Sequence, residues 1–385
     1  MEQWKEYKIE DICEQIFAGG DTAKYNSSKH QTPLYNIPIY ANSTENEGLY
    51  GYCDKAVVSS PAVTIAARGA GIGFVAFRNK PFVPIVRLIT LITNNLVDTK
   101  FLYYYLKNRK LSGDGSAIPQ ITVPMVKKEV ITVPVLEEQK RIADILSSLD
   151  DKIELNRRIN DNLEQQAQAL FKAWFVDFDP FKDSEFVDSE LGMIPKGWKV
   201  VSLGEVTKQI TEKVGNREDV TVLSPINSGE LVLSEEYFIK QVFSKDLSKY
   251  LIVNPLSFAY NPARINIGSI GLNTFDFVGC VSPIYVVFEC EPNYQYFFDF
   301  FKRTATFKEE VALRAIGGVR QSLGYNDFSL IKTVYPTQDV VVKFNNLYLK
   351  MKEVINQNVI QNGKFISLRD SLLPRLMSGE LKINN

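Results

Sequence analysis

The chain begins twice, and this internal repeat constrains its fold more than any other feature. The segment WKEYKIEDI at 4–12 is matched by WKVVSLGEV at 198–206, with the tryptophan, the lysine and the apolar positions in one register. FLYYYLKN at 101–108 is matched by YFFDFFKR at 296–303. AIPQITV at 117–123 corresponds to GVRQSLG at 318–324, which aligns Gln120 with Gln321. A repeat that covers nearly the whole chain predicts two copies of one structural unit.

Each copy ends in a strand-like run that is followed by a long helical pattern. The runs end at Pro134 and Pro336, and apolar residues then recur at alternating spacings of four and three. The first seam is Ile142, Leu146, Leu149, Ile153, Asn156, Asn160, Leu163, Ala167, Leu170 and Trp174. The second is Val340, Phe344, Leu347, Met351, Val354, Asn358, Gln361, Phe365, Leu368 and Leu372. This alternation is typical of a coiled coil.

Both seams turn polar in the middle. Asn156 and Asn160 in the first helix occupy the seam positions that correspond to Asn358 and Gln361 in the second. A polar residue at a seam position costs stability and fixes the register of the pair. We therefore expect the helices to pack antiparallel, because that arrangement brings the two polar middles together. The alternative is that each polar stretch faces water or a third chain.

These patterns predict an α+β protein with two mixed α/β domains, each followed by a long helix. The two helices would form an antiparallel coiled coil with pseudo-two-fold symmetry. The expected boundaries are 1–137 for the first domain, 138–177 for its helix, 178–197 for a connector, 198–338 for the second domain, 339–378 for its helix and 379–385 for the tail. A helix of about 37 residues is about 55 Å long. That length suits a spacer between domains.

Five segments together resemble the DNA-specificity subunit (S subunit) of type I restriction-modification systems. They are LFKAWFVDFDPF at 170–181, ELGMIPKGWK at 190–199, KDLSKY at 245–250, YNPARINIGSIGL at 260–272 and LLPRLMSGEL at 372–381. The resemblance implies that each mixed domain is a target recognition domain that reads one half of a bipartite target in double-stranded DNA. It also implies that the helices set the unread gap. The rival interpretation is a duplicated coiled-coil adaptor without a role in DNA recognition.

Candidate DNA-binding residues lie in loops beside glycine, which permits close approach of a backbone to a ligand. Base reading favours Arg, Asn and Gln side chains. The candidates in the first domain are Asn42, Arg68, Gly69, Gln120 and Thr122. Those in the second domain are Asn261, Arg264, Asn266, Arg320 and Gln321. The resemblance places the loops around Gln120 and Gln321 near DNA. Each candidate could equally serve a tight turn or cap a local backbone group.

The residues do not predict an enzyme that acts by itself. The chain has one histidine, His30, and no glycine-rich motif for a nucleotide phosphate. Asn261-Pro262 lacks the second proline and the aromatic residue of an adenine methyltransferase loop. The four cysteines have no metal-ligand spacing. We therefore expect no cofactor and no metal in this chain.

The resemblance assigns the chemistry to partner subunits. Two modification subunits would use S-adenosylmethionine to methylate adenine, and restriction subunits would use ATP and Mg²⁺ to translocate and cleave DNA. The aromatic residues at the end of the first helix are candidate docking residues for the modification subunits, although they could instead close a core. They are Trp174, Phe175, Phe178 and Phe181.

Charge and hydropathy bear on partners and location. A net charge of −1 is unusual for a protein that binds nucleic acid alone, so basic residues would gather on one face or come from a partner. The sequence contains no run of about 18 apolar residues, so a membrane span is not expected. The charged N-terminus lacks a signal core. These features predict a cytoplasmic protein, and the resemblance implies that the cell is a bacterium or an archaeon.

Overall fold

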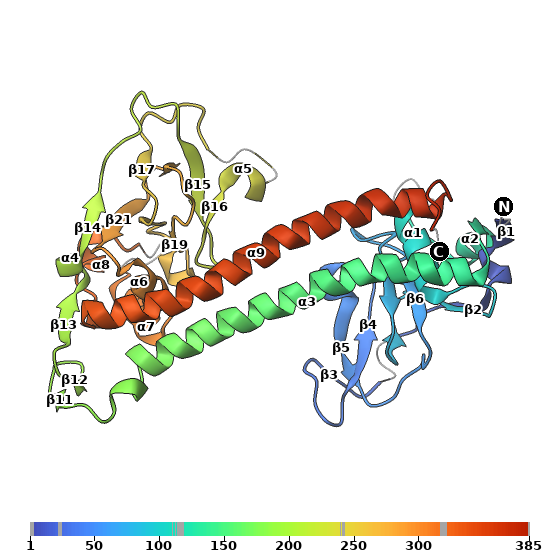
Figure 1. Cartoon of the computed structure of the whole chain (residues 1–385), viewed down its shortest axis with the longest axis horizontal. Coiled ribbons are helices and arrows are strands. Elements are labelled where there is room, and N and C mark those ends of the chain that lie inside the picture. The colour runs from blue at the N-terminus through green and yellow to red at the C-terminus, as the bar shows by residue number, and fades with distance from the viewer. Residues whose placement is uncertain are drawn as a thin grey trace. The chain divides into compact units, whose positions relative to one another are not determined.

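A computed structural model describes residues 4–21, 25–109, 111, 113, 119–238, 240, 243–315 and 322–383. The chain divides into two compact units, and each unit combines separate stretches of sequence. The first unit is Met1–Arg158 with Asn358–Asn385, and the second is Ile159–Gln357. Each unit therefore contains part of both long helices, α3 (Leu136–Phe175) and α9 (Gln338–Met377). Figure 1 shows each helix as one continuous ribbon, α3 in green and α9 in red.

The described residues of the first unit form a main sheet, a hairpin sheet and a strand pair. The main sheet has the order β2 (Cys13–Ala18), β9 (Ile89–Thr93), β6 (Ala62–Ile65), β7 (Val75–Arg78). The hairpin sheet has the order β3 (Ser27–Ser28), β5 (Leu49–Cys53), β4 (Ile37–Tyr40), β8 (Val83–Pro84). The strand pair is β1 (Lys5–Lys8) with β10 (Val130–Val133). The helical elements are η1 (Ile9–Asp11), η3 (Glu45–Gly48), α1 (Thr99–Asn108) and α2 (Val123–Lys128).

The first unit folds around residues that the alternation of the strands places inside. All four residues of β6 are buried, as expected for the centre of a sheet that is covered on both faces. Helix α1 begins at Asp98, whose carboxylate accepts a hydrogen bond from the Phe101 backbone nitrogen at 2.9 Å. Phe101, Leu102 and Leu106 are then buried in the core. The buried Gln139 side chain joins the start of α3 to this cap by accepting from the Asp98 backbone nitrogen at 2.9 Å.

The second unit repeats this plan. Its main sheet has the order β14 (Thr207–Ile210), β21 (Val286–Cys290), β18 (Phe258–Tyr260), β19 (Ile270–Leu272). Its hairpin sheet has the order β16 (Leu231–Leu233), β15 (Thr221–Pro225), β20 (Gly279–Val281), β17 (Leu251–Val253). The strand pairs are β13 (Lys199–Ser202) with β22 (Lys332–Tyr335), and β11 (Phe186–Val187) with β12 (Ile194–Pro195). The helical elements are η4 (Asp179–Phe181), α4 (Leu203–Val206), α5 (Ser234–Tyr237), η5 (Ile265–Ile267), α6 (Gln295–Phe301), α7 (Ala305–Arg314) and α8 (Tyr325–Phe328).

The two hairpin sheets differ at one edge. Three strands correspond, because β5–β4–β8 and β16–β15–β20 share one antiparallel hairpin beside one parallel pair. The fourth strand lies at opposite edges: β3 pairs with β5 in the first unit, and β17 pairs with β20 in the second. The repeat is therefore strict in the main sheet and looser in the hairpin sheet.

The repeated tryptophan has the same place in both units. In the first unit the Trp4 ring lies against Gly379, just past the end of α9. In the second unit the Trp198 ring contacts Phe175, Phe178 and Phe181 at the end of α3, with ring centroids 5.1 to 6.0 Å apart. The two segments that begin with Trp-Lys thus close each unit onto the end of a long helix.

The predicted helices at 138–177 and 339–378 correspond to α3 and α9, which begin and end one or two residues earlier. The ten seam positions predicted in α3 are all buried or half-buried. In α9 the predicted seam is wrong at alternate positions. Leu347, Val354, Gln361 and Leu368 are exposed, while the residues that follow them, Tyr348, Ile355, Asn362 and Arg369, are half-buried.

The offset in α9 has a physical cause. A seam chosen for the greatest number of apolar residues leaves out polar residues whose partners are distant in sequence. Arg369 and Asn362 are among the inward residues because each bonds to α3: the Arg369 guanidinium reaches the Asp150 carboxylate at 2.6 Å, and Asn362 Nδ2 donates to the Ile153 carbonyl at 3.3 Å. No helix in the described part of the chain is both long enough and apolar enough to cross a membrane.

Candidate nucleic-acid interface

The turn between β6 and β7 brings two predicted residues of the first unit together. Gly69 and Gly73 have φ angles of 85° and 80°, which glycine adopts without a steric penalty. The Ile121 backbone nitrogen donates to the Ala67 carbonyl at 2.9 Å, so the segment before α2 lies beside this turn. The Arg68 guanidinium then donates to Gln120 Oε1 at 3.2 Å. The structure thus forms one polar pair from residues that are 52 positions apart.

The Arg68 side chain is only half-buried, and its guanidinium retains unused donors. Its Nε atom is buried and has no hydrogen-bond partner among the described residues. A buried donor without a partner costs free energy unless a ligand or water satisfies it. A phosphate or a guanine edge offers the acceptors that a guanidinium fork prefers.

Two other predicted residues of the first unit are engaged with backbone. Asn42 Oδ1 accepts from the Ala67 nitrogen at 2.8 Å, and its Nδ2 donates to the Val86 carbonyl. Thr122 caps α2, where its hydroxyl accepts from the Met125 nitrogen at 3.4 Å. These bonds favour a structural role for Asn42 and Thr122, because the groups that a base would need already have partners.

The corresponding turn of the second unit follows β18. Asn261 Oδ1 accepts from the Ala263 nitrogen at 3.0 Å, which is a local turn, and Gly268 has a φ of 95°. Arg264 and Asn266 both lie on the exposed side of this turn. Burial raises the pKa of the neighbouring Tyr285 hydroxyl, while the positive charge of Arg264 and a hydrogen bond with Asn261 oppose that shift. Arg264 thus presents its charge at the surface of this turn.

The backbone hydrogen bonds correct the alignment of the two copies. Leu323 donates to the Pro262 carbonyl at 3.1 Å, as Ile121 donates to the Ala67 carbonyl. Gln120 therefore corresponds to Ser322, one residue beyond the expected Gln321. By the same bonds Arg68 corresponds to Ala263, and Arg264 to Gly69. The predicted residues Arg320 and Gln321 lie outside the described residues.

The two units therefore present different polar groups from one backbone frame. Arg68 and Gln120 are paired in the first unit, and Arg264 and Asn266 occupy the turn of the second. The hairpin loops at 41–48 and 226–230 pack against these turns. A β-carbon on Gly71 would come within 2.6 Å of Thr44 Cγ2, and one on Gly268 would come within 2.6 Å of the Asn227 carbonyl oxygen.

Comparisons with known proteins agree with this arrangement. Residues 1–165 match the family model described as a type I restriction modification DNA specificity domain. The specificity subunit of the type I restriction enzyme MjaIX from Methanocaldococcus jannaschii is 28% identical over 99% of this chain and 94% of its own length. The HindI specificity subunit from Haemophilus influenzae is 24% identical over 99% of this chain and all of its own. Over nearly its whole length the chain is thus similar to specificity subunits of type I restriction enzymes.

The fold of the chain is also that of a solved protein. The crystal structure of the S subunit from M. genitalium aligns with a TM-score of 0.61 at 17% identity, covering 97% of this chain and 96% of that one.

A group of amides lies between α3 and α9. In the first unit Asn156, which is 6% exposed, donates to Gln361 Oε1 at 2.8 Å and to Asn362 Oδ1 at 2.9 Å. In the second unit Asn160 Nδ2 lies 3.5 Å from the Ile355 carbonyl. Asn362 was missed because the segment 356–362 contains three asparagines and two glutamines, and the predicted seam takes the neighbouring Gln361 instead. Asn358 is half-buried.

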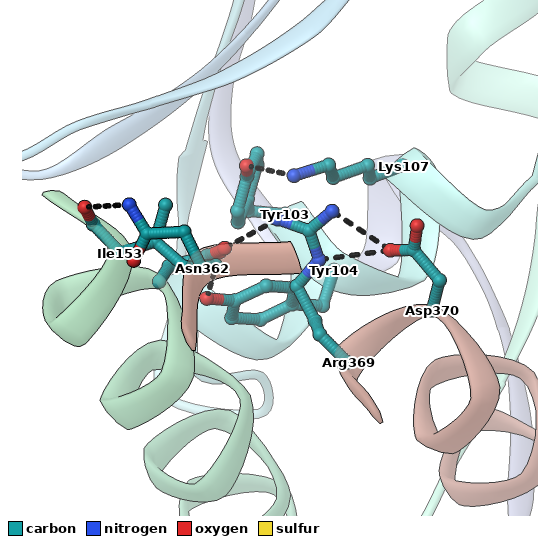
Figure 2. A network of polar contacts seen from close by, with 8 residues as sticks. Tyr103, Tyr104, Lys107, Ile153, Asn362, Arg369 and Asp370 are labelled. Carbon is teal, nitrogen blue, oxygen red and sulfur yellow. Dashed lines mark hydrogen bonds and ion pairs between the residues drawn. The ribbon is translucent and has the colours of Figure 1, made fainter. Parts of the chain in front are cut away.

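A second polar network joins α1 to both helices within the first unit. The Tyr104 hydroxyl donates to Asp150 at 2.7 Å, and Arg369 donates to the same carboxylate and to Asp370. Figure 2 shows Arg369 beside Asp370 and Tyr104, with Asn362 reaching Ile153 nearby. The ions and amides thus link the domain to its pair of helix segments.

The four predicted docking residues lie in an aromatic cluster of the second unit. Phe175 is 7% exposed and packs among Trp198, Phe297 and Phe344, and the other three are half-buried against the same core. They close the core where helix meets domain, which was the second of the two expected roles. Beside them lies a groove of about 740 Å³, lined in part by Phe171, Phe175, Phe300 and Val334.

Proposed function

We propose that this chain is a type I specificity subunit that reads a bipartite sequence in double-stranded DNA, with one half-site contacted by each unit. The observation that carries the proposal is the repeated turn, which offers Arg68 with Gln120 in one unit and Arg264 with Asn266 in the other. Arg, Gln and Asn are the side chains best suited to base edges in the major groove. One frame with different side chains would let the two units read different bases.

The long helices would set the number of unread base pairs between the half-sites. Each helix contributes residues to both units, so its length and register constrain both. The amides at Asn156 and Asn160 support this role, because buried polar groups fix register in helix pairs. The adaptor alternative would need neither the repeated turns nor their exposed cation.

The chemistry would come from partner subunits. Modification subunits would bring S-adenosylmethionine and methylate adenine in each half-site, and restriction subunits would bring ATP and Mg²⁺ for translocation and cleavage. The complex would act in the cytoplasm of a bacterium or archaeon, where the DNA lies. In this scheme the specificity subunit contributes only recognition and spacing.

Two equivalent grooves support docking of two copies of one partner. The groove of the second unit has a counterpart of about 520 Å³ in the first unit, lined by residues that include Trp4, Tyr105, Thr132 and Met377. Thr132 and Val334 lie on the equivalent strands β10 and β22, and Tyr105 and Phe300 lie on the equivalent helices α1 and α6. Of the four predicted docking residues, Phe175 and Phe178 line the groove and would meet the partner, whereas Trp174 and Phe181 would support it from the adjoining core.

Methylome sequencing of a strain with and without this gene tests the function. The expected result is one two-part motif that loses methylation when the gene is deleted. A motif with a single contiguous half, or no change in methylation, would contradict the proposal.

The roles of the two arginines are separated by binding measurements on the complex with modification subunits. Arg68→Ala and Arg264→Ala are compared on cognate and altered DNA at two salt concentrations. Loss of a base contact reduces discrimination by about 1–3 kcal/mol at one position, whereas loss of a phosphate contact weakens all sequences alike and reduces the salt slope. Arg157→Ala and Arg217→Ala, exposed residues away from the turns, are the controls. Unchanged binding in both arginine variants would remove the turns from the interface.

The grooves are tested by adding bulk and charge. Ser378→Arg blocks the first groove and Ala305→Arg blocks the second, since both residues are exposed at a groove edge. Each single variant should retain one modification subunit, and the double variant none, as measured by native mass spectrometry. Binding of two subunits by the double variant would place the docking surface elsewhere.

A further inference from the structure

A buried arginine holds the hairpin loop of the first unit. Arg78 ends β7 and is only 4% exposed. Its Nη2 donates to the Glu47 carbonyl at 2.6 Å, its Nε donates to Thr64 Oγ1 at 3.2 Å, and its guanidinium lies 3.7 Å from the centre of the Tyr40 ring. Arg78 thus ties the loop between β4 and β5 to the main sheet.

That loop has a backbone which needs external support. Asn46 and Glu47 have φ angles of 46° and 52°, in the left-handed region that costs a residue other than glycine about 1 kcal/mol or more. Such a conformation persists only when the surroundings hold it. The bond from Arg78 to the Glu47 carbonyl fixes the loop at this point. The same loop carries Asn42, which accepts from the nitrogen of Ala67 beside Arg68.

A buried lysine does the corresponding work in the second unit. Lys302 follows α6, and its side chain is 2% exposed. Its Nζ donates to the Gly229 carbonyl at 2.5 Å and to the Ile270 carbonyl at 3.0 Å, and it pairs with Asp299 at 2.8 Å. Gly229 belongs to the hairpin loop between β15 and β16, and Ile270 begins β19. The turn just before Ile270, between β18 and β19, carries Arg264 and Asn266; we call it, and the turn between β6 and β7 in the first unit, the recognition turns. Lys302 thus joins the loop and the turn directly.

Burial of these cations is costly, and stability alone does not explain it. Burial lowers the pKa of both Arg78 and Lys302, and the charge of Glu47 or Asp299 opposes the shift. A buried ion pair is often no more stabilising than apolar residues of the same size. The two cations come from different elements, one from a strand and one from the end of a helix, yet each donates to a carbonyl of the corresponding hairpin loop in its own unit.

We propose that Arg78 and Lys302 are positioning residues for base recognition, each setting the hairpin loop and the recognition turn of its own unit in one relative position. The proposal rests on the proposed reading of one half-site by each unit. A base contact needs its side chain held to within about 0.5 Å. A loop that moves more than this would reduce discrimination between bases before it reduced the total affinity for DNA. Neither cation would touch DNA itself.

The test uses the complete complex with modification subunits and the target known from methylome sequencing. Lys302→Met and Arg78→Met are compared with wild type on cognate DNA and on DNA with one base changed in either half-site. Each variant should lose at least about fivefold of its discrimination, and only at the half-site of its own unit. The salt slope and the affinity for random DNA should stay unchanged, because no phosphate contact is lost.

Matched variants separate positioning from general stability. Lys352→Met replaces a half-buried lysine of the second unit, whose Nζ lies 5.5 Å from the centre of the Tyr296 ring and outside the loops. Asp299→Asn removes the ion pair but leaves Lys302 its two carbonyl acceptors. Both should keep full discrimination even where the melting temperature falls. If Lys302→Met does not fold, the first unit still tests the inference through Arg78→Lys. This variant keeps a positive charge and a hydrogen-bond donor, so it should retain part of the discrimination that Arg78→Met loses.

The outcomes are distinguishable. Full discrimination in Lys302→Met and Arg78→Met overturns the inference and leaves the proposed function intact. Loss of discrimination at both half-sites, or an equal loss in Asp299→Asn, would show a general effect of stability and would also overturn it. A wild-type complex without any sequence discrimination would instead refute the proposed function.

Discussion

Substitution of Asn156 by alanine tests whether the amides between the helices stabilise the first unit. The Asn156 side chain is nearly buried and its Nδ2 makes two hydrogen bonds of 2.8 and 2.9 Å to amide oxygens of α9. Each such bond contributes about 0.5–1.5 kcal/mol net. Gln361 is exposed, so water can replace its lost partner, whereas Asn362 is half-buried. The expected cost is therefore about 1–2 kcal/mol.

The assay is thermal unfolding of the purified chain, monitored by differential scanning calorimetry. For a unit of this size a loss of 1–2 kcal/mol lowers the melting temperature by about 2–8 °C. Asn162→Ala is the control, because it removes an exposed amide bond to Gln166 on the part of α3 that belongs to the second unit, and so should leave the transition of the first unit unchanged. The transition assigned to the first unit should therefore fall further in Asn156→Ala than in Asn162→Ala.

Removal of both partners makes the sharper comparison. In Asn156→Leu with Asn362→Leu neither buried amide is left alone, so the double variant should be at least as stable as wild type. An Asn156→Ala variant no less stable than its control, or a double variant less stable than Asn156→Ala, would refute this account of the helix pair.

Three further predictions follow from the packing. Phe171→Ala should destabilise the second unit by about 3–5 kcal/mol, because that ring is 4% exposed and packs among four other phenylalanines; chemical denaturation measures the loss, and a change below 1 kcal/mol would contradict the packing. Arg369→Met should cost about 1–2 kcal/mol, since Asp150 keeps the Tyr104 hydroxyl but loses its partly buried cation; Lys172→Met, which removes an exposed ion pair, should cost less. Burial raises the pKa of Cys13 to about 12 and of Cys280 to about 11, and it also raises the pKa of the Cys53 and Cys290 thiols, so a thiol reagent at pH 8 should react with all four only after unfolding; rapid labelling of the native chain would disprove this.

Much of the architecture is a property of the sequence alone. The repeat of the Trp-Lys segments, the period-two strands and the period of the helices are local patterns, and each follows from which residues can face a core at a given spacing. The inward face of α3 is one such case, since every predicted seam residue is at least half-buried. The family resemblance is of the same kind, because it depends on contiguous segments such as 170–181 and 372–381.

Tertiary structure alone decided which surfaces meet. The inward face of α9 includes Asn362 and Arg369 because their partners lie on α3, more than 200 residues earlier in the chain. The loops at 41–48 and 226–230 are held by hydrogen bonds from Arg78 and Lys302, which lie 31 and 73 residues further along the chain than the carbonyls they reach. A polar side chain in a sequence gives no sign of whether a distant carbonyl or carboxylate will satisfy it. That information arises when the chain closes, because the cost of burying a polar group depends on the partner that the fold supplies.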